Sequence, residues 1–235
     1  MSRIGVLGGM GPSATVDFMD KVIRLTPASR DQDHLPMIVL NSPQIPDRSS
    51  AILGNGPDPL PILLAGIDLL NKIGVGVVAI PCNSSHHWYS QMAERSHAPI
   101  IHIADACVLA VPTSPGTQVA IFATRGALKS GFYQQALRQR GIDFLIPDSD
   151  TGQDEIDACI RAVKAGQIEE GSRQLDMAMV MSAKAGANAI IMGCTEIPIA
   201  SRGMDPTRLT LIDSALELAR ATVAFALEKR WNQSP

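Results

Sequence analysis

The sequence lacks an excess of basic residues, a long apolar run and an apolar signal-peptide core. Its 235 residues carry 20 lysines and arginines against 23 aspartates and glutamates, a formal charge of -3. Without surplus positive charge, neither a nucleic acid nor an anionic membrane is an expected partner. The longest apolar stretches, such as residues 74–80, fall far short of the roughly 20 residues of a membrane-spanning helix. Met1-Ser2-Arg3 leads into a glycine-rich turn, which predicts a cytoplasmic protein.

Cysteine is scarce and is not spaced for disulfides or for zinc. The chain has four, Cys82, Cys107, Cys159 and Cys194, with no C-x-x-C pair, so free thiols are expected. A zinc site could combine two of them with His86 and His87, yet no metal-binding spacing supports it. A thiol hydrolase would need a dedicated histidine, and His86 is the local candidate. The G-x-S-x-G elbow and the Walker loop are both missing.

The chain does contain a repeated alternation of short aliphatic runs with segments of helical length. Apolar residues make up 46% and charged residues 18%, as in a folded globular protein. Such runs are typical of buried parallel strands joined by crossover helices. The predicted strands cover residues 3–7, 37–41, 76–80, 100–103, 118–123, 143–146, 189–192 and 209–211. The predicted helices cover residues 13–25, 59–73, 85–95, 104–111, 131–140, 151–164, 169–185 and 213–230. The pattern predicts an α/β fold with mainly parallel sheets flanked by helices.

Two parts of the chain resemble each other. Residues 4–9 are similar to residues 119–124, and residues 77–82 are similar to residues 189–194, at nearly the same separation. This predicts two similar α/β domains related by a pseudo-twofold duplication, with the site between them. The domains would cover residues 1–112 and 113–212, and the C-terminal helix of about residues 213–231 could pack back on the first. Chance similarity between strands is the alternative explanation.

Cys82 and Cys194 share one sequence context. Each follows an apolar strand and precedes polar residues that can open a helix, in Pro81-Cys-Asn-Ser-Ser-His86 and Gly193-Cys-Thr-Glu196. Both thiols are therefore expected at the carboxyl edge of a sheet, where open α/β folds bind ligands. The dipole of a following helix would stabilise a thiolate, which can serve as a base or nucleophile. Cys107 and Cys159 lie inside helical patterns and are interpreted as inert.

A glycine-rich turn, Gly8-Gly-Met-Gly-Pro12, lies between the first strand and a helix that Pro12 can start. Unpaired N–H groups at that helix start could bind a carboxylate or phosphate. The turn and Ala14 also fit the G-x-G-x-x-A pattern of dinucleotide-binding proteins. However, the second strand ends in Asn41-Ser42 instead of an acidic residue that would bind ribose. An NAD-dependent oxidoreductase is therefore a remote alternative, and a plain tight turn is another.

Five motifs occur in order along the chain. They are Gly8-Gly-Met-Gly-Pro12, Asn41-Ser-Pro-Gln-Ile-Pro-Asp-Arg48, Pro81-Cys-Asn-Ser-Ser-His86, Val163-Lys-Ala-Gly166 and Gly193-Cys-Thr-Glu-Ile197. Together they resemble the aspartate/glutamate racemase superfamily, and more closely its aspartate racemase branch. Glu196, where glutamate racemases carry a histidine, favours that branch, as does the run that ends in Arg48. The resemblance implies a cofactor-independent racemase of two similar domains that clamp an amino-acid substrate, usually as a homodimer.

The resemblance also implies roles for individual residues. Cys82 and Cys194 would flank the substrate α-carbon, one as thiolate and one as thiol, and exchange roles with the direction of reaction. Arg48 would grip a substrate carboxylate bidentately, and Lys164 would supply a second positive charge. The candidate donors to an ene-diolate-like transition state are Asn83, Ser84, Thr124 and Thr195, and Met10 would form the pocket floor through its backbone. No metal or organic cofactor is expected.

The identity of the substrate stays open at this point. Ser84-Ser85 stands where Thr-Ala is more usual, and the doubled His86-His87 is also atypical for the resemblance. The alternatives are a glutamate or broader-specificity amino-acid racemase and an isomerase of another small carboxylic acid. A non-catalytic amino-acid-binding relative would keep Arg48 and Asn83 but tolerate the loss of a thiol. Both thiols are present, which favours an enzyme.

Overall fold

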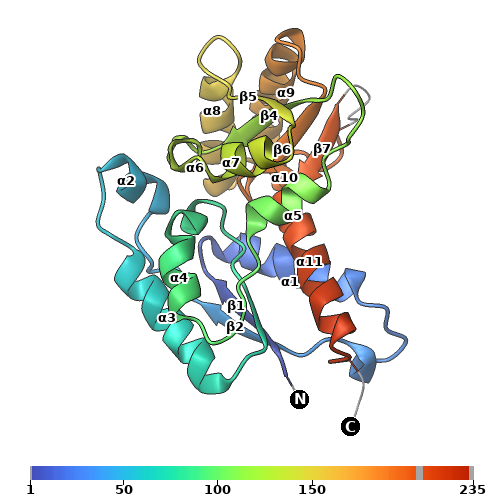
Figure 1. Cartoon of the computed structure of the whole chain (residues 1–235). Coiled ribbons are helices and arrows are strands. Elements are labelled where there is room, and N and C mark those ends of the chain that lie inside the picture. The colour runs from blue at the N-terminus through green and yellow to red at the C-terminus, as the bar shows by residue number, and fades with distance from the viewer. Residues whose placement is uncertain (1, 205–208, 233–235) are drawn as a thin grey trace.

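The computed structural model of the chain describes residues 2–204 and 209–232. It contains two parallel sheets, which occupy the lower and upper parts of the molecule in Figure 1. The first sheet has the order β2 (Met37–Asn41), β1 (Ile4–Gly8) and β3 (Val77–Ala79). The second has the order β5 (Asp143–Leu145), β4 (Gln118–Ala123), β6 (Ala189–Gly193) and β7 (Thr210–Asp213). Every strand pairing is parallel, so the predicted α/β class is confirmed.

Helices connect the strands, as crossover connections between parallel strands require. In the first part of the chain, from β1 to α5, the helices are α1 (Pro12–Leu25), α2 (Arg48–Leu53), α3 (Leu60–Ile73), α4 (Tyr89–Arg95) and α5 (Ile103–Leu109), with 3₁₀ helices at Asp31–Asp33 and Ser84–Trp88. In the second part, from β4 to α11, the helices are α6 (Arg125–Ser130), α7 (Phe132–Gln139), α8 (Gln153–Lys164), α9 (Ile168–Lys184), α10 (Ile197–Ala200) and α11 (Ser214–Glu228). Pro12 occupies the first turn of α1, as expected. No helix among the described residues is long and apolar enough to cross a membrane.

Two sequence predictions about local structure are wrong. Residues 100–103 form no strand, because Ile100 makes only a single bridge to Val78 and Ile103 already begins α5. His102 starts that helix by accepting a hydrogen bond from the Ala104 N–H at 3.2 Å. The predicted helix at residues 85–95 is divided into a 3₁₀ helix and α4. The short helices α2, α6 and α10 were not predicted, because a few residues show no helical period.

The pairing of β1 with β3 in the first sheet matches the pairing of β4 with β6 in the second. Ile4 of β1 lies opposite Val77 of β3, and Val119 of β4 lies opposite Ala189 of β6. These four residues are the starts of the segments that sequence similarity matched. Strands β3 and β6 therefore lead out of their sheets at equivalent places, each toward a cysteine.

The core is shared between the two sheets. Alternating side chains of β1 and β4, including Ile4 and Val119, meet α5 and α11 in one buried cluster. The opposite faces are covered separately, because Leu7 packs in a cluster with α3 and Phe122 in one with α8 and α9. Strands buried on both faces explain why the aliphatic runs are continuous rather than alternating.

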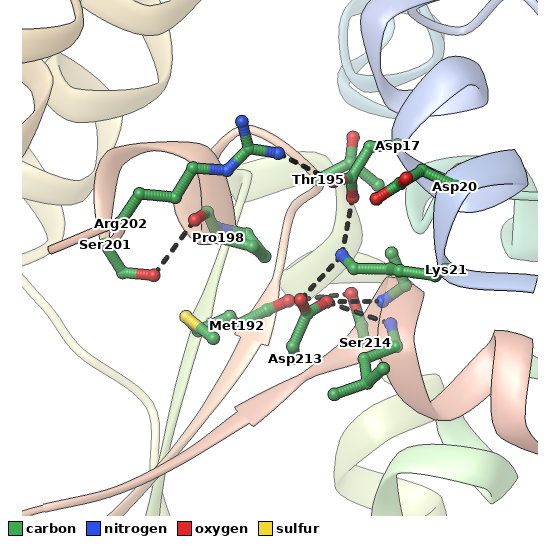
Figure 2. A network of polar contacts seen from close by, with 12 residues as sticks. Asp17, Asp20, Lys21, Met192, Thr195, Pro198, Ser201, Arg202, Asp213 and Ser214 are labelled. Atoms are coloured by element: carbon green, nitrogen blue, oxygen red, sulfur yellow. Dashed lines mark hydrogen bonds and ion pairs between the residues drawn. The ribbon is translucent and has the colours of Figure 1, made fainter. Parts of the chain in front are cut away.

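A network of ion pairs joins the two parts beside the shared core. Helix α11 leaves the second sheet after β7 and runs along α1 (Figure 1). Asp213 caps α11 by accepting from the N–H groups of its first turn. Lys21 of α1 donates to Asp213 at 2.7 Å and also to Asp17, and Arg202 reaches Asp17 at 2.8 Å (Figure 2). These contacts tie α1 to the end of β7 and to the segment after α10.

Candidate active site

One small cavity between the two parts brings together the residues predicted for the site. Its lining includes Met10, Arg48, Cys82, Asn83 and Ser84 from the first part, and Thr124, Lys164, Cys194 and Thr195 from the second. The volume is about 20 Å³, enough for about one water molecule. An amino acid is larger, so residues around the cavity must rearrange to admit one. The cavity is also lined by Asp47, Ser49 and Glu196, for which no role was predicted from the sequence.

Both thiols are nearly buried and lie just beyond strand ends. Cys82 is 5% exposed and Cys194 is 7% exposed. The turn after β3 is held by the Cys82 N–H, which donates to the Ile80 carbonyl at 2.8 Å, and by the Ser85 hydroxyl, which donates to the Cys82 carbonyl at 2.7 Å. The structure thus places the two thiols on one cavity, as the strand-end context predicted, and their catalytic role remains a prediction.

Cys194 is held as a thiol by a neighbouring carboxylate. Its Sγ donates to Glu196 Oε2 at 2.9 Å, and the Thr195 hydroxyl donates to the same oxygen at 3.2 Å. Burial raises the pKa of Cys194 well above its ordinary value, and the negative charge of Glu196 raises it further, while Lys164 acts in the opposite direction. The expected thiolate stabilisation by a helix is therefore wrong for Cys194. Helix α10 is only four residues long, and burial and Glu196 determine the direction of the pKa shift of Cys194.

Lys164 ends α8 and stays charged at the edge of the cavity. Desolvation alone would lower its pKa, but nearby acidic groups, Glu196 foremost and Asp47 among them, outweigh desolvation, so the pKa is raised. Lys164 and Glu196 also line a larger groove of about 1330 Å³ next to the cavity. The pair therefore lies where the cavity meets the groove.

Arg48 presents one free edge of its guanidinium. Asp47 caps α2 by accepting from the Ser50 N–H at 2.7 Å, which places Arg48 at the first helical position. Arg48 Nη1 donates to the carbonyls of Ile45 and Pro46 at 3.0 and 2.9 Å, and Nη2 donates to Met10 at 3.3 Å. Its Nε is buried and has no partner among the described residues. Nη1 is fully occupied and Nη2 makes one bond, so Nε and the second N–H of Nη2 are the donors that remain for a carboxylate.

Hydroxyl groups close the cavity from both sides. Ser84 Oγ and Thr124 Oγ1 are 3.1 Å apart, which links the loop after Cys82 to the start of α6. Thr124 also caps α6 by accepting from the Ala127 N–H at 3.2 Å. Ser49 of α2 accepts from the Gly126 N–H at 3.2 Å. These bonds join the two parts, and the roles of Ser84 and Thr124 as donors to the substrate remain predictions.

The Asn83 side chain is fixed by two buried partners. Its Nδ2 donates to the Ser214 hydroxyl at 3.0 Å, and its Oδ1 accepts from the Tyr133 hydroxyl. Neither Tyr133 nor Ser214 was predicted from the sequence, because neither belongs to a motif and both are distant from Asn83 along the chain. The predicted role of Asn83 as a donor to the substrate remains a prediction.

The glycine-rich turn serves close backbone packing. The Gly9 N–H donates to the Thr15 hydroxyl at 2.8 Å. Gly9 has a φ of +90°, and a Cβ at this position would lie 2.2 Å from the Ser42 nitrogen. Only glycine fits such a contact. Because the Gly9 N–H is already bonded, the turn gives the dinucleotide alternative no support.

The remaining cysteines, Cys107 and Cys159, do not line the cavity. Burial raises the pKa of Cys159 to about 12 and also raises the pKa of Cys107, as expected of inert thiols. Within residues 2–204 and 209–232, no group of three or more His, Cys, Asp or Glu side chains is arranged to hold a metal ion.

His86, just after the Cys82 turn, is expected to make stability depend on pH. Its Nε2 bonds the Ile80 carbonyl at 3.2 Å, and burial, together with His102, lowers its pKa to about 3. The pKa of His86 in the unfolded chain is about 6.5, so between about pH 6.5 and pH 3 this side chain binds a proton in the unfolded state but not in the folded state. The free energy of unfolding should therefore fall, by up to about 1.4 kcal/mol per pH unit, as the pH drops from about 6.5 toward 3.

Denaturant unfolding of a His86→Gln variant from pH 7 to pH 5 measures this effect. Glutamine can donate to Ile80 but does not titrate, so the variant should show a shallower loss of stability than the wild type. His97 is exposed, and His97→Gln should leave the slope unchanged. Equal slopes for the wild type and His86→Gln would show that His86 is not the source.

Comparison with known proteins gives a consistent result. The sequence profile of the family described as Asp/Glu/Hydantoin racemase matches residues 7–222. The broad specificity amino-acid racemase RacX of Bacillus subtilis (strain 168) is 27% identical over 228 residues, which cover 95% of this chain and 98% of that protein. The aspartate racemase of Picrophilus torridus has a TM-score of 0.85 and 29% identity, over 96% of this chain and 94% of that one. Glutamate racemase of Francisella tularensis subsp. tularensis SCHU S4, solved with D-glutamate, shares the fold at a TM-score of 0.72 and 18% identity, over 100% of this chain and 84% of that one.

The matched segment contains every residue that lines the cavity, including both thiols. The two parallel sheets flanked by helices agree with the two-domain fold of the racemase structures. The chain belongs to the Asp/Glu/hydantoin racemase family.

Proposed function

We propose that the protein is a cofactor-independent amino-acid racemase that interconverts L- and D-aspartate by proton transfer between two thiols. The observation that carries the proposal is the meeting of Cys82, Cys194 and Arg48 on one cavity. Inverting an α-carbon requires a proton to leave one face and another to arrive on the opposite face. Two thiols from two sheets supply one group for each face.

The environment of Cys194 suggests how the resting enzyme begins. Cys194 is a thiol bonded to Glu196, so it is the proton donor, and Cys82 acts first as the thiolate base. Cys82 removes the α-proton of one enantiomer while Cys194 protonates the opposite face. The products are the other enantiomer, a Cys82 thiol and a Cys194 thiolate. The reverse reaction starts from that state, with the Cys194 thiolate as the base and the Cys82 thiol as the proton donor, and it restores the Cys194 thiol bonded to Glu196.

A dicarboxylate substrate fits the charges of the site. The free edge of Arg48 can bind one carboxylate, and Lys164 can attract the second, since both cations line the cavity. A broader-specificity racemase is the second candidate, favoured by the similarity to RacX. In that case the charge of Lys164 is balanced by the nearby charge of Glu196, and the substrate side chain needs no charge. A homodimer in the cytoplasm, expected from the family resemblance and from the sequence, is part of this proposal.

A panel of L-amino acids, assayed for their D-enantiomers by chiral chromatography, tests the proposal. We expect aspartate to be racemised fastest. The assay is repeated with enzyme that has been dialysed against a chelator and treated with a carbonyl reagent. Because the proposed chemistry uses only side chains, both treatments should leave the rate unchanged. Equal rates with uncharged amino acids would favour the broader enzyme. Failure with every amino acid, or activity that returns only on adding metal or pyridoxal phosphate, would contradict the proposal.

A further inference from the structure

The two thiols follow strands of different sheets, so their separation depends on contacts between the residues beside them. Asn83, next to Cys82, donates to the Ser214 hydroxyl at 3.0 Å. Ser214 begins α11 and donates to the carbonyl of Met192 at 2.7 Å (Figure 2). Met192 lies in β6, two residues before Cys194. A buried chain of hydrogen bonds therefore runs from beside one thiol to beside the other.

Tyr133 contacts this series of hydrogen bonds near both of its ends, at Asn83 and at Gly193, which follows Met192. Its hydroxyl donates to Asn83 Oδ1. Its ring packs against Gly193, where an added Cβ would lie 3.0 Å from the Tyr133 Cε2 atom. Tyr133 lies in α7 and is 1% exposed. A single buried side chain from a third element thus contacts the residue after Cys82 and the residue before Cys194.

The donor and acceptor of each hydrogen bond in this series follow from its last member, which is a backbone carbonyl. The Met192 carbonyl can only accept, so Ser214 donates to it and accepts from the amide nitrogen of Asn83. The amide oxygen of Asn83 is then left to accept from Tyr133. The Cys107 thiol lies 3.6 Å from the Tyr133 oxygen and can donate to it. Because these buried groups satisfy one another, the network favours a single arrangement.

We propose that Tyr133 is a positioning residue that sets the separation of Cys82 and Cys194, an inference that rests on the proposed two-thiol function. The hydroxyl fixes the loop of the first thiol, and the ring fixes the strand that leads to the second. Proton transfer to opposite faces requires both thiols at the right distance from one carbon, so an error of about 1 Å is expected to be costly.

The variant Tyr133→Phe tests this role. It keeps the ring against Gly193 but leaves the buried Asn83 oxygen without its donor. The rate of racemisation should fall by about 10- to 100-fold, with little change in KM. In deuterium oxide, one thiol should still remove and return a proton on its own face. Deuterium in the recovered starting enantiomer should therefore rise relative to deuterium in the product.

Two more variants make the result decisive. Tyr89→Phe also loses one hydroxyl bond, to the Ile100 carbonyl at 3.2 Å, and should leave the ratio of exchange to racemisation unchanged. Ser214→Ala breaks the same chain at another link and should raise the ratio even if Tyr133→Phe does not fold. A wild type that neither racemises nor exchanges any amino acid would overturn the proposed function and this role with it. An active wild type whose ratio is the same in Tyr133→Phe and Ser214→Ala would overturn the positioning role alone.

Discussion

Replacing either Cys82 or Cys194 by alanine is expected to lower racemisation by about 10²–10⁴-fold, the usual contribution of a general acid or base. Each thiol serves one face of the α-carbon, so the loss of either leaves one face without a proton donor or acceptor. Serine variants should keep a trace of activity, because a hydroxyl is a poorer base than a thiol. Chiral chromatography of both enantiomers measures the loss in each direction.

The remaining thiol gives a second and more specific result. Without Cys194, Cys82 should still exchange the α-hydrogen of one enantiomer with solvent deuterium and with retention of configuration. Without Cys82, Cys194 should do the same for the other enantiomer. Cys159 is fully buried and does not line the cavity, so it provides the matched control, and Cys159→Ala should racemise at nearly the wild-type rate. A hydrolase or transferase would depend on one cysteine and tolerate loss of the other. Substantial racemisation by either alanine variant would exclude the two-thiol mechanism.

The second large effect is expected at Arg48. Arg48→Ala should raise the KM for aspartate by about 10- to 100-fold, since a hydrogen bond to a charged group contributes about 1.5–3 kcal/mol. The KM for alanine, which lacks the second carboxylate, should rise less. The structure adds that Arg48 also binds the carbonyls of Ile45, Pro46 and Met10. A fall in kcat is therefore expected beside the rise in KM.

Arg125 provides a matched control for Arg48. It begins α6, next to Thr124, but its side chain is paired with Asp154 and Asp157 on the surface. Arg125→Ala should leave the KM for aspartate nearly unchanged, because pairs of this kind contribute little. If Arg48→Ala bound aspartate as tightly as the wild type, the carboxylate would have to be bound elsewhere, with Lys164 as the next candidate.

The sequence predicted those features that depend on local pattern. Continuous aliphatic runs predicted strands buried on both faces. The matched segments predicted two similar halves, and the structure pairs their first residues equivalently, Ile4 with Val77 and Val119 with Ala189. The sites of Cys82 and Cys194 followed from their places after strands. The division of the chain near residue 112 is still a prediction.

Features that depend on distant contacts could not be predicted in this way. Tyr133 and Ser214 are 50 and 131 positions from Asn83, and neither carries a local signal. The protonation of Cys194 depends on burial and on the orientation of Glu196, which its place in a motif did not reveal. Only the folded structure brings these groups together.

The isotopic course of the reaction in deuterium oxide tests the central claim most directly. Either enantiomer of aspartate is mixed with wild-type enzyme, and both enantiomers are separated and analysed by mass spectrometry at less than about a tenth of full conversion. If two thiols act on opposite faces, the product should carry deuterium at the α-carbon while the remaining substrate stays largely protiated, in both directions. Product that retains the α-hydrogen of the substrate would mean that one group serves both faces, and it would contradict the account.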